Sequence, residues 1–215
     1  MAGSGGTGEA RRGAIEAVLW DLGGVLLDWD PRHLYRKLFG ADVAAMDDFL
    51  ADVCSPAWHE QQDLGKSTAQ ACTELAAQHP GQADLIKAWA ERNEEMVRGA
   101  IGGSVEILAE VRQAGVACYA LSNMEKESWQ RRLGLYEFLN WFDGYFISSL
   151  EGVMKPDPHY FRRALARFGL KPGHCLFIDD RTENTEAAAE LGIRTVLFRS
   201  PEELREDLVA GGLLA

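Results

Sequence analysis

Residues 17–28 read AVLWDLGGVLLD, and this stretch determines what kind of fold the chain can adopt. Four apolar residues lead to Asp21, and glycines follow at positions 23 and 24. Continuous apolar runs of this length are typical of strands buried on both faces of a parallel sheet. Similar runs occupy residues 116–121 before Ser122, 175–178 before Asp179, and 194–198. The chain therefore offers four candidate strands of one buried sheet.

Helical patterns separate these runs and predict the layers around the sheet. They occupy residues 105–112, 160–168 and 183–191, and a glycine follows each of them within three residues. Alternation of strand and helix predicts an α/β fold with a doubly wound parallel sheet. We assign residues 14–30 and 100–215 to this core.

The interval 31–99 interrupts the alternation. It contains amphipathic helical stretches at 31–39, 42–53, 68–78 and 82–97, and no convincing strand. This is too much helix for a single crossover connection, so we expect a helical cap inserted after the first strand. Residues 1–13 are Gly-rich without an apolar core, and we expect a flexible tail there rather than a signal peptide.

Charge and cysteine content narrow the class of partner. The 215 residues include 33 acidic and 22 basic ones, a net charge of −11 that disfavours nucleic acid and anionic membranes as partners. No apolar run approaches the roughly 18–20 residues of a membrane span. The four cysteines form no CxxC pair, which is consistent with a reducing, cytoplasmic location. Monomer and dimer both remain open.

Polar residues follow the predicted strands. They are Asp21, the pair Ser122 and Asn123, and the pair Asp179 and Asp180, while Lys155 lies in a Pro-rich loop. Ligands of open parallel sheets bind beyond the carboxyl ends of the strands, so these side chains are expected to converge. Taken singly, each residue would more often be a helix cap or a surface charge; their joint placement favours a site.

This set of residues suits phosphoryl transfer. A carboxylate that attacks a phosphate dianion meets like-charge repulsion, which a divalent cation held by oxygen ligands offsets. Asp21 and Asp180, supported by Asp179, predict a Mg²⁺ site. Ser122, the backbone amides around Asn123, and Lys155 are candidates for binding the phosphoryl group.

Four segments together resemble the signature motifs of the haloacid dehalogenase (HAD) superfamily, in its sugar-phosphatase-like branch with an α-helical cap. They are AVLWDLGGVLLD (17–28), ALSNMEKE (120–127), GVMKPDPHYF (152–161) and CLFIDDRTENTEAA (175–188). The resemblance covers residues 15–210 and implies a HAD-like core of the Rossmann type. It implies a Mg²⁺-dependent hydrolase acting on a small phosphorylated metabolite, with a sugar phosphate as the expected class.

The resemblance also implies roles for single residues. Asp21 would be the nucleophile that forms an aspartyl-phosphate, with Ser122 and Lys155 on the phosphoryl group. Asp21, the backbone carbonyl of Gly23, and Asp180 would coordinate Mg²⁺, with Asp179 close by. Asn184 would orient these ligands.

One position departs from the family pattern. HAD phosphatases usually carry a second aspartate two residues after the nucleophile, where it protonates the leaving group and then activates water; this chain has Gly23. Such acid–base help is worth about 10²–10⁴-fold in rate. We therefore expect slow turnover, or a preference for good leaving groups, unless Asp28, His59 or Glu60 replaces the missing acid.

Two other functions remain open at this stage. A haloacid dehalogenase is compatible with Gly23, but the Asp179–Asp180 pair argues against it because dehalogenases of this family generally carry neutral residues there. A weakly active, HAD-like binding protein is the second.

Residues 58–63, WHEQQD, are interpreted equally well as a substrate-facing segment containing His59 and Glu60 or as a surface loop anchored by Trp58.

Overall fold

The computed structural model describes residues 14–215, and the prediction of a flexible tail at 1–13 lies outside them. Its main sheet has five parallel strands in the order β5-β4-β1-β6-β7. The strands are β1 Ala17–Trp20, β4 Ala117–Ser122, β5 Gly144–Ile147, β6 Cys175–Asp179 and β7 Arg194–Leu197. From the central β1 the chain continues to β4 and β5 on one side and then to β6 and β7 on the other. The predicted doubly wound α/β sheet is confirmed.

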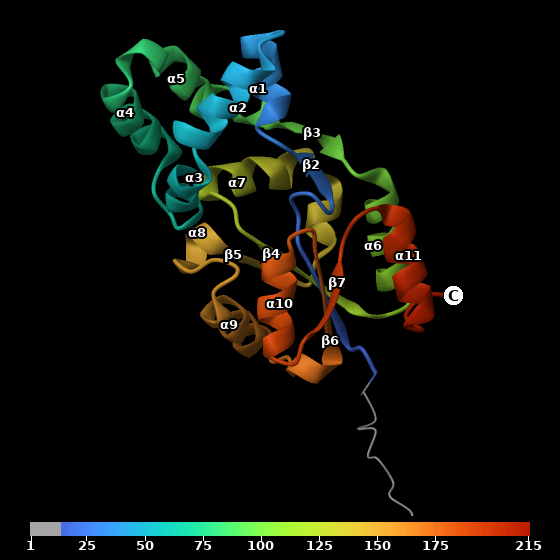
Figure 1. Ribbon diagram of the computed structural model, residues 1–215. Coiled ribbons are helices and arrows are strands. Elements are labelled where there is room, and N and C mark those ends of the chain that lie inside the picture. The colour runs from blue at the N-terminus through green and yellow to red at the C-terminus, as the bar shows by residue number, and fades with distance from the viewer. Residues whose placement is uncertain (1–13) are drawn as a thin grey trace, which may run out of the picture.

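Alternate residues of the strands supply the two faces of the core. Val18 and Trp20 of β1 pack in one hydrophobic cluster, and Ala17 and Leu19 pack in another. Helices α6 and α11 cover the first face and helices α9 and α10 the second (Figure 1). These helices span Gly102–Gln113 (α6), Pro158–Phe168 (α9), Thr182–Glu190 (α10) and Pro201–Ala210 (α11). Two further helices, α7 Lys126–Leu135 and α8 Ser148–Glu151, follow β4 and β5.

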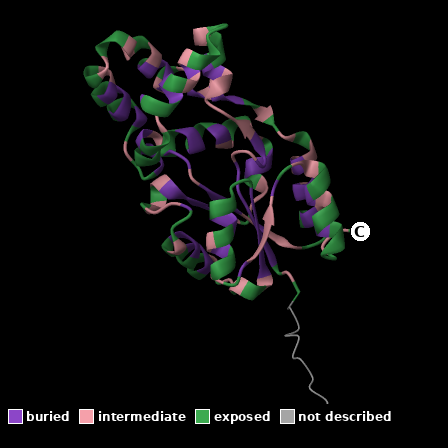
Figure 2. Cartoon of the chain, in the orientation of Figure 1, coloured by how far each residue is buried: buried purple, intermediate pink, exposed green. Residues whose placement is uncertain are grey.

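Residues 32–91, which follow β1 in the chain, form a helical layer of their own. Its helices are α1 Arg32–Phe39, α2 Val43–Asp52, α3 Pro56–Asp63, α4 Thr68–Gln78 and α5 Ala83–Glu91. They share a separate hydrophobic cluster that includes Tyr35, Phe49 and Trp89. Figure 2 shows buried positions running through both this layer and the sheet, with exposed positions on the outward helix faces. We refer to these helices, residues 32–91, as the cap.

Three strand features differ from the sequence-based prediction. The stretch expected to be helical over 82–97 ends at Glu91, and Val97–Ala100 forms β3. β3 pairs antiparallel with β2, Leu27–Trp29, so the two chain segments that connect the cap lie side by side. The fifth strand of the main sheet, β5, was also not predicted. Among the described residues, no helix combines the length and apolar character needed to cross a membrane.

Candidate active site

The predicted residues meet at the carboxyl edge of the sheet. Lys155 is buried, and its Nζ lies 2.9 Å from Asp21 Oδ1 and 2.6 Å from Asp179 Oδ2. The same ammonium donates to the backbone carbonyl of Leu121, 3.0 Å away, at the end of β4. Lys155 therefore joins residues at the carboxyl ends of β1, β4 and β6.

Lys155 is held in place through its backbone. The side chain of Asn123 accepts from the backbone N–H of Lys155 at 2.9 Å and donates to its carbonyl at 2.9 Å. These two bonds commit the Asn123 side chain to Lys155, so the backbone amides around Asn123 stay the predicted phosphate contact. Ser122 is buried beside it and, like Lys155, lines the cavity described below.

The acidic residues form one cluster. Asp21, Asp179 and Asp180 each place a carboxylate oxygen within 4.8 Å of the others. Asp179 is held by hydrogen bonds: its Oδ1 accepts from the backbone N–H of Arg181 and from Nδ2 of Asn184, both at 2.9 Å. Asn184 therefore holds one oxygen of Asp179 by a hydrogen bond. Asp21 Oδ1 also accepts from the N–H of Leu22, and the carboxylate of Asp180 lies next to Gly24.

Gly24 makes this arrangement sterically possible. A Cβ at position 24 would clash with the carboxylate of Asp180, and the backbone has a φ of +74°, which favours glycine. Gly23 differs, since a Cβ there would meet no atom within 4 Å. Position 23 thus faces open space.

The charges in the cluster are unbalanced. Burial and the neighbouring acids raise the pKa of Asp21 to about 8, although Lys155 opposes this shift. Burial and Asp179 also raise the pKa of Asp180. Burial disfavours the charged form of Lys155, but the adjacent carboxylates outweigh it and raise its pKa. Three carboxylates next to a single ammonium fit a divalent cation with oxygen ligands, so the residues present suit Mg²⁺.

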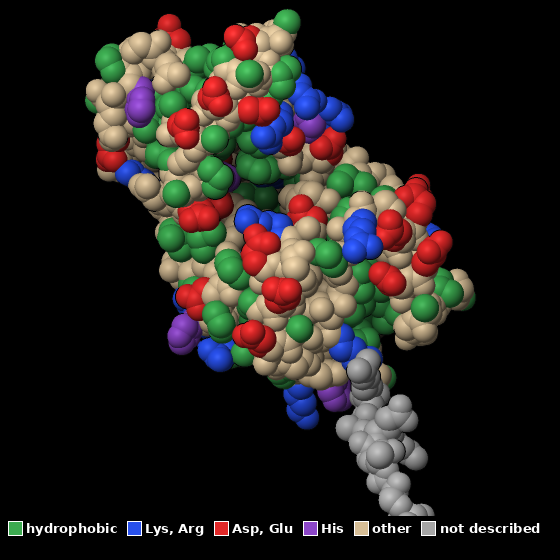
Figure 3. Space-filling model, in the orientation of Figure 1, with side chains coloured by type: hydrophobic (Ala, Val, Ile, Leu, Met, Phe, Trp, Pro, Cys, Tyr) green, Lys and Arg blue, Asp and Glu red, His purple; other side chains and the backbone are tan. Residues whose placement is uncertain are grey.

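A cavity of about 620 Å³ extends from this cluster to the cap. It opens where the surface is hollowed between the cap and the sheet (Figure 3). Its cap side carries His59, Glu60 and Asp63 from α3, together with Trp29 and Trp89. Residues 58–63 belong to helix α3, so the interpretation as a surface loop is wrong, although Trp58 is buried in the cap as its anchor. His59 and Glu60 line the cavity, as the other interpretation expected.

His59 sits between aromatic rings. It stacks on Trp29 with ring centroids 5.4 Å apart and meets Trp89 edge-on at 5.1 Å. Burial lowers the pKa of His59 to about 4. Asp28, the other residue considered as a substitute acid, pairs instead with His33 and Arg98 and is not among the lining residues.

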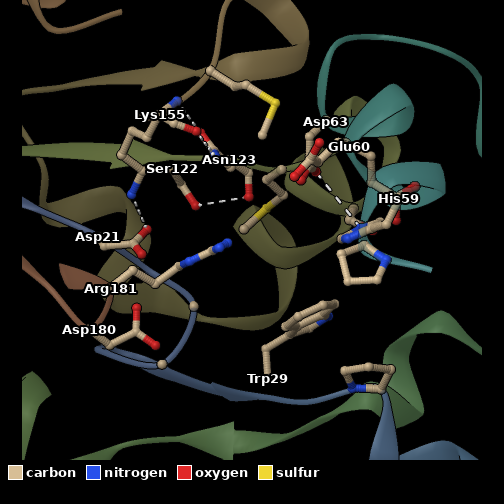
Figure 4. Close-up of a pocket in the computed structure, with 18 of the residues that line it drawn as sticks. Asp21, Trp29, His59, Glu60, Asp63, Ser122, Asn123, Lys155, Asp180 and Arg181 are labelled. Carbon is tan, nitrogen blue, oxygen red and sulfur yellow. Dashed lines mark hydrogen bonds and ion pairs between the residues drawn. The ribbon is translucent and has the colours of Figure 1, made fainter. Parts of the chain in front are cut away.

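The sequence did not single out several lining residues. Arg181 directly follows the acidic pair and projects into the cavity in Figure 4. Glu125 lies inside the quoted segment 120–127, where it accepts hydrogen bonds from Thr68 and Asn93 near the cap and from Ser128. Asp63 is four residues after His59, a spacing that places two residues on one helix face once a helix is assumed.

The family model of haloacid dehalogenase-like hydrolases matches residues 15–192. The chain belongs to this family. It is 27% identical to the sesquiterpene phosphatase of Aspergillus oryzae over 180 residues, which cover 83% of this chain and 87% of that protein. It is 26% identical to the drimenol cyclase of Aspergillus calidoustus over 90% of this chain, but spans only 36% of that protein.

The fold also matches solved structures of HAD hydrolases. A HAD family enzyme from Bacteroides thetaiotaomicron, in complex with magnesium and inorganic phosphate, superposes with a TM-score of 0.67 at 23% identity, covering 87% of this chain and 96% of the other. The L-2-haloacid dehalogenase of Xanthobacter autotrophicus superposes with a TM-score of 0.59 at 18% identity, covering 94% of this chain and 85% of the other. The chain is therefore a hydrolase of the HAD superfamily, and the proteins similar to it include phosphatases.

Proposed function

We propose that this HAD hydrolase is a Mg²⁺-dependent phosphatase of small phosphorylated metabolites, with Asp21 as its nucleophile. One observation carries the proposal: Asp21, paired with Lys155 at 2.9 Å and clustered with Asp179 and Asp180, lines a cavity large enough for a metabolite. The sesquiterpene phosphatase among the relatives and the magnesium and phosphate bound in a structural neighbour support the same chemistry.

The residues divide the work as follows. An Asp21 carboxylate oxygen forms a bond to phosphorus as the bond to the leaving-group oxygen breaks, which gives an aspartyl-phosphate; water then releases phosphate and restores Asp21. Lys155 and Ser122 hold the phosphoryl oxygens, and Asn123 and Asn184 fix Lys155 and Asp179 in position. Asp21, Asp180 and the carbonyl of Gly23 would hold Mg²⁺, which when bound supplies charge that offsets the repulsion between carboxylate and phosphate.

The residues that line the cavity indicate which substrates it could accept. Trp29, Trp89 and Leu50 offer apolar surface, whereas His59, Glu60 and Asp63 offer polar groups. A sugar phosphate remains our expected substrate class, and His59 and Glu60 are the proposed contacts to its leaving group. Because one relative is a sesquiterpene phosphatase, the substrates to be tested include prenyl phosphates as well.

The test measures phosphate release by the full chain from sugar phosphates, acyl phosphates, prenyl phosphates and p-nitrophenyl phosphate. Asp21→Asn should reduce release to background, and EDTA should do the same until Mg²⁺ is restored. Asp52→Asn, at an exposed position of α2, is the matched control and should leave the rate unchanged. Activity that survives in Asp21→Asn or in EDTA would contradict the proposal. Halide release from 2-chloropropionate without metal would establish the dehalogenase alternative.

A further inference from the structure

The proposed reaction leaves one proton without a source. The leaving oxygen must be protonated as its bond to phosphorus breaks, and the residue two positions after Asp21 is Gly23. Glycine has no side chain that could deliver the proton, and the space beside its α-carbon is open. Another acid in the cavity has to supply it, and this inference rests on the proposed function.

Apart from the cluster around Asp21, four acids line the cavity: Asp47, Glu60, Asp63 and Glu125. Glu125 is occupied by hydrogen bonds from Thr68, Asn93 and Ser128. Asp47 accepts from Arg32 Nε at 3.0 Å. Glu60 lies on the exposed side of α3. Asp63 is the acid that is neither paired nor exposed.

Asp63 is buried without a hydrogen-bond partner at one oxygen. Its side chain is 8% exposed, and Oδ1 has no partner among the described residues. The nearest basic atom is Nε2 of His59 at 3.8 Å, beyond hydrogen-bond distance. A buried, unsatisfied carboxyl oxygen is costly in a folded protein, and in a cavity it points to a ligand that completes its hydrogen bonding.

The electrostatic surroundings leave Asp63 able to hold a proton at neutral pH. Burial raises its pKa to about 7, Glu60 acts in the same direction, and Lys155, Arg132 and Arg181 oppose the shift. His59 is kept neutral by its own burial, and Glu125 and Arg132 are the charged groups that act on it from α7 and the turn before it. A pKa near the working pH is what a group needs if it is to donate a proton and then accept one.

The direction of the reaction agrees with this position. In a displacement at phosphorus the leaving oxygen departs on the side opposite the attacking oxygen. Asp21 attacks from the sheet, so the leaving oxygen points away from β1. Figure 4 shows Asp63 on the opposite side of the cavity from Asp21, on the wall formed by α3.

We propose that Asp63 is the general acid and base of this enzyme, taking over from the cap the task that Gly23 cannot perform. As the bond between Asp21 and phosphorus forms and the ester bond breaks, the Asp63 proton passes to the leaving oxygen. The Asp63 carboxylate then accepts a proton from the water that attacks the aspartyl-phosphate, and both aspartates return to their initial states.

The experiment compares substrates whose leaving groups differ in acidity. In Asp63→Asn, kcat/KM, which reports on formation of the aspartyl-phosphate, should fall by about 10²–10⁴-fold for alkyl phosphates. For p-nitrophenyl phosphate kcat/KM should change little because nitrophenolate leaves without protonation, whereas kcat should fall because hydrolysis of the aspartyl-phosphate has lost its base. Adding Gly23→Asp to this variant should restore the alkyl phosphate rate. Asp47→Asn makes the same substitution at a paired acid of the same cavity and should show no dependence on the leaving group.

Other outcomes overturn the assignment. An equal loss of both kcat and kcat/KM on all leaving groups would make Asp63 structural, and an equal loss of kcat/KM with kcat unchanged would make it a substrate contact. An unchanged rate would assign the proton to another group. Asp63→Ala, measured in parallel, covers the case in which the asparagine disturbs packing. If the wild type releases no phosphate, or if Asp21→Asn retains activity, the proposed function fails instead; these results are separate from a flat leaving-group dependence in an active wild type.

Discussion

Replacing Asp63 by asparagine should make the protein more stable at neutral and alkaline pH. In the unfolded chain this carboxyl has a pKa of 3.8, whereas burial in the cavity wall raises it to about 7. The folded state therefore binds one more proton between these values, and the stability present below pH 3.8 is lost as the pH rises toward 7. At about 1.4 kcal/mol per pH unit, the loss reaches up to about 4 kcal/mol. Asparagine keeps the shape and removes the titration.

His59 makes the variant necessary, because it hides this loss in the wild type. Burial lowers its pKa from 6.5 to about 4, so here the unfolded chain binds the extra proton and stability rises with pH across that interval. The two slopes oppose each other between pH 4 and 6.5. The difference between variant and wild type isolates Asp63, since both chains contain His59 and the acidic cluster.

The measurement is urea unfolding followed by tryptophan fluorescence from pH 4 to pH 8, in EDTA for both chains. The free energy of unfolding of Asp63→Asn relative to the wild type should increase by about 2–4 kcal/mol across this range. Near pH 4 both side chains are largely neutral, which provides the internal reference. A difference that stays constant with pH, or a variant that is less stable at pH 8, would refute the assigned burial of this carboxyl.

Three further predictions concern other parts of the site. Lys155→Met leaves two buried carboxylates without their cation, so it should lower the free energy of unfolding in EDTA by about 3–5 kcal/mol, and a loss below 1 kcal/mol in urea unfolding would contradict the pairing. Gly24→Ala places a methyl group against Asp180, so at least about tenfold more Mg²⁺ should be needed for half-maximal phosphate release; an unchanged requirement would remove Asp180 from the metal site. Glu125→Gln weakens the hydrogen bonds that include Thr68 of the cap, so limited proteolysis should cut the cap several-fold faster, and equal rates of cleavage would show that these bonds do not restrain it.

Much of the fold could be predicted because the central strands are buried on both faces. β1, β4, β6 and β7 produce apolar runs that do not depend on the rest of the molecule, and glycines end the intervening helices. β5 contributes only Tyr145, Phe146 and Ile147 as apolar residues, and Tyr145 is exposed. Its burial depends on packing against α9, which the local sequence does not encode. β2 and β3 are short, and each exists because the other lies beside it.

Some residues of the candidate site could likewise be predicted from the sequence, and others could not. Asp21, Ser122, Lys155, Asp179 and Asp180 could be identified because each follows a strand or lies in a recognisable motif. Asp63 could not, since its importance comes from the burial of one oxygen and from a cavity formed between two layers. The local signals are its place at the end of the segment 58–63 and its spacing from His59. Roles that depend on an unsatisfied atom become visible only when all neighbouring atoms are in place.

The antiparallel pair of β2 and β3 has a consequence for how the cap is attached. Trp29 and Val97 are partners in this antiparallel pair, so the chain enters the cap and returns from it at residues that lie directly opposite each other. Excising everything between them would require no more than a tight hairpin turn to reconnect the ends. The helices that shape the cavity can therefore be exchanged, lengthened or lost while the sheet keeps its register, which makes leaving-group preference separable from the machinery that handles phosphate.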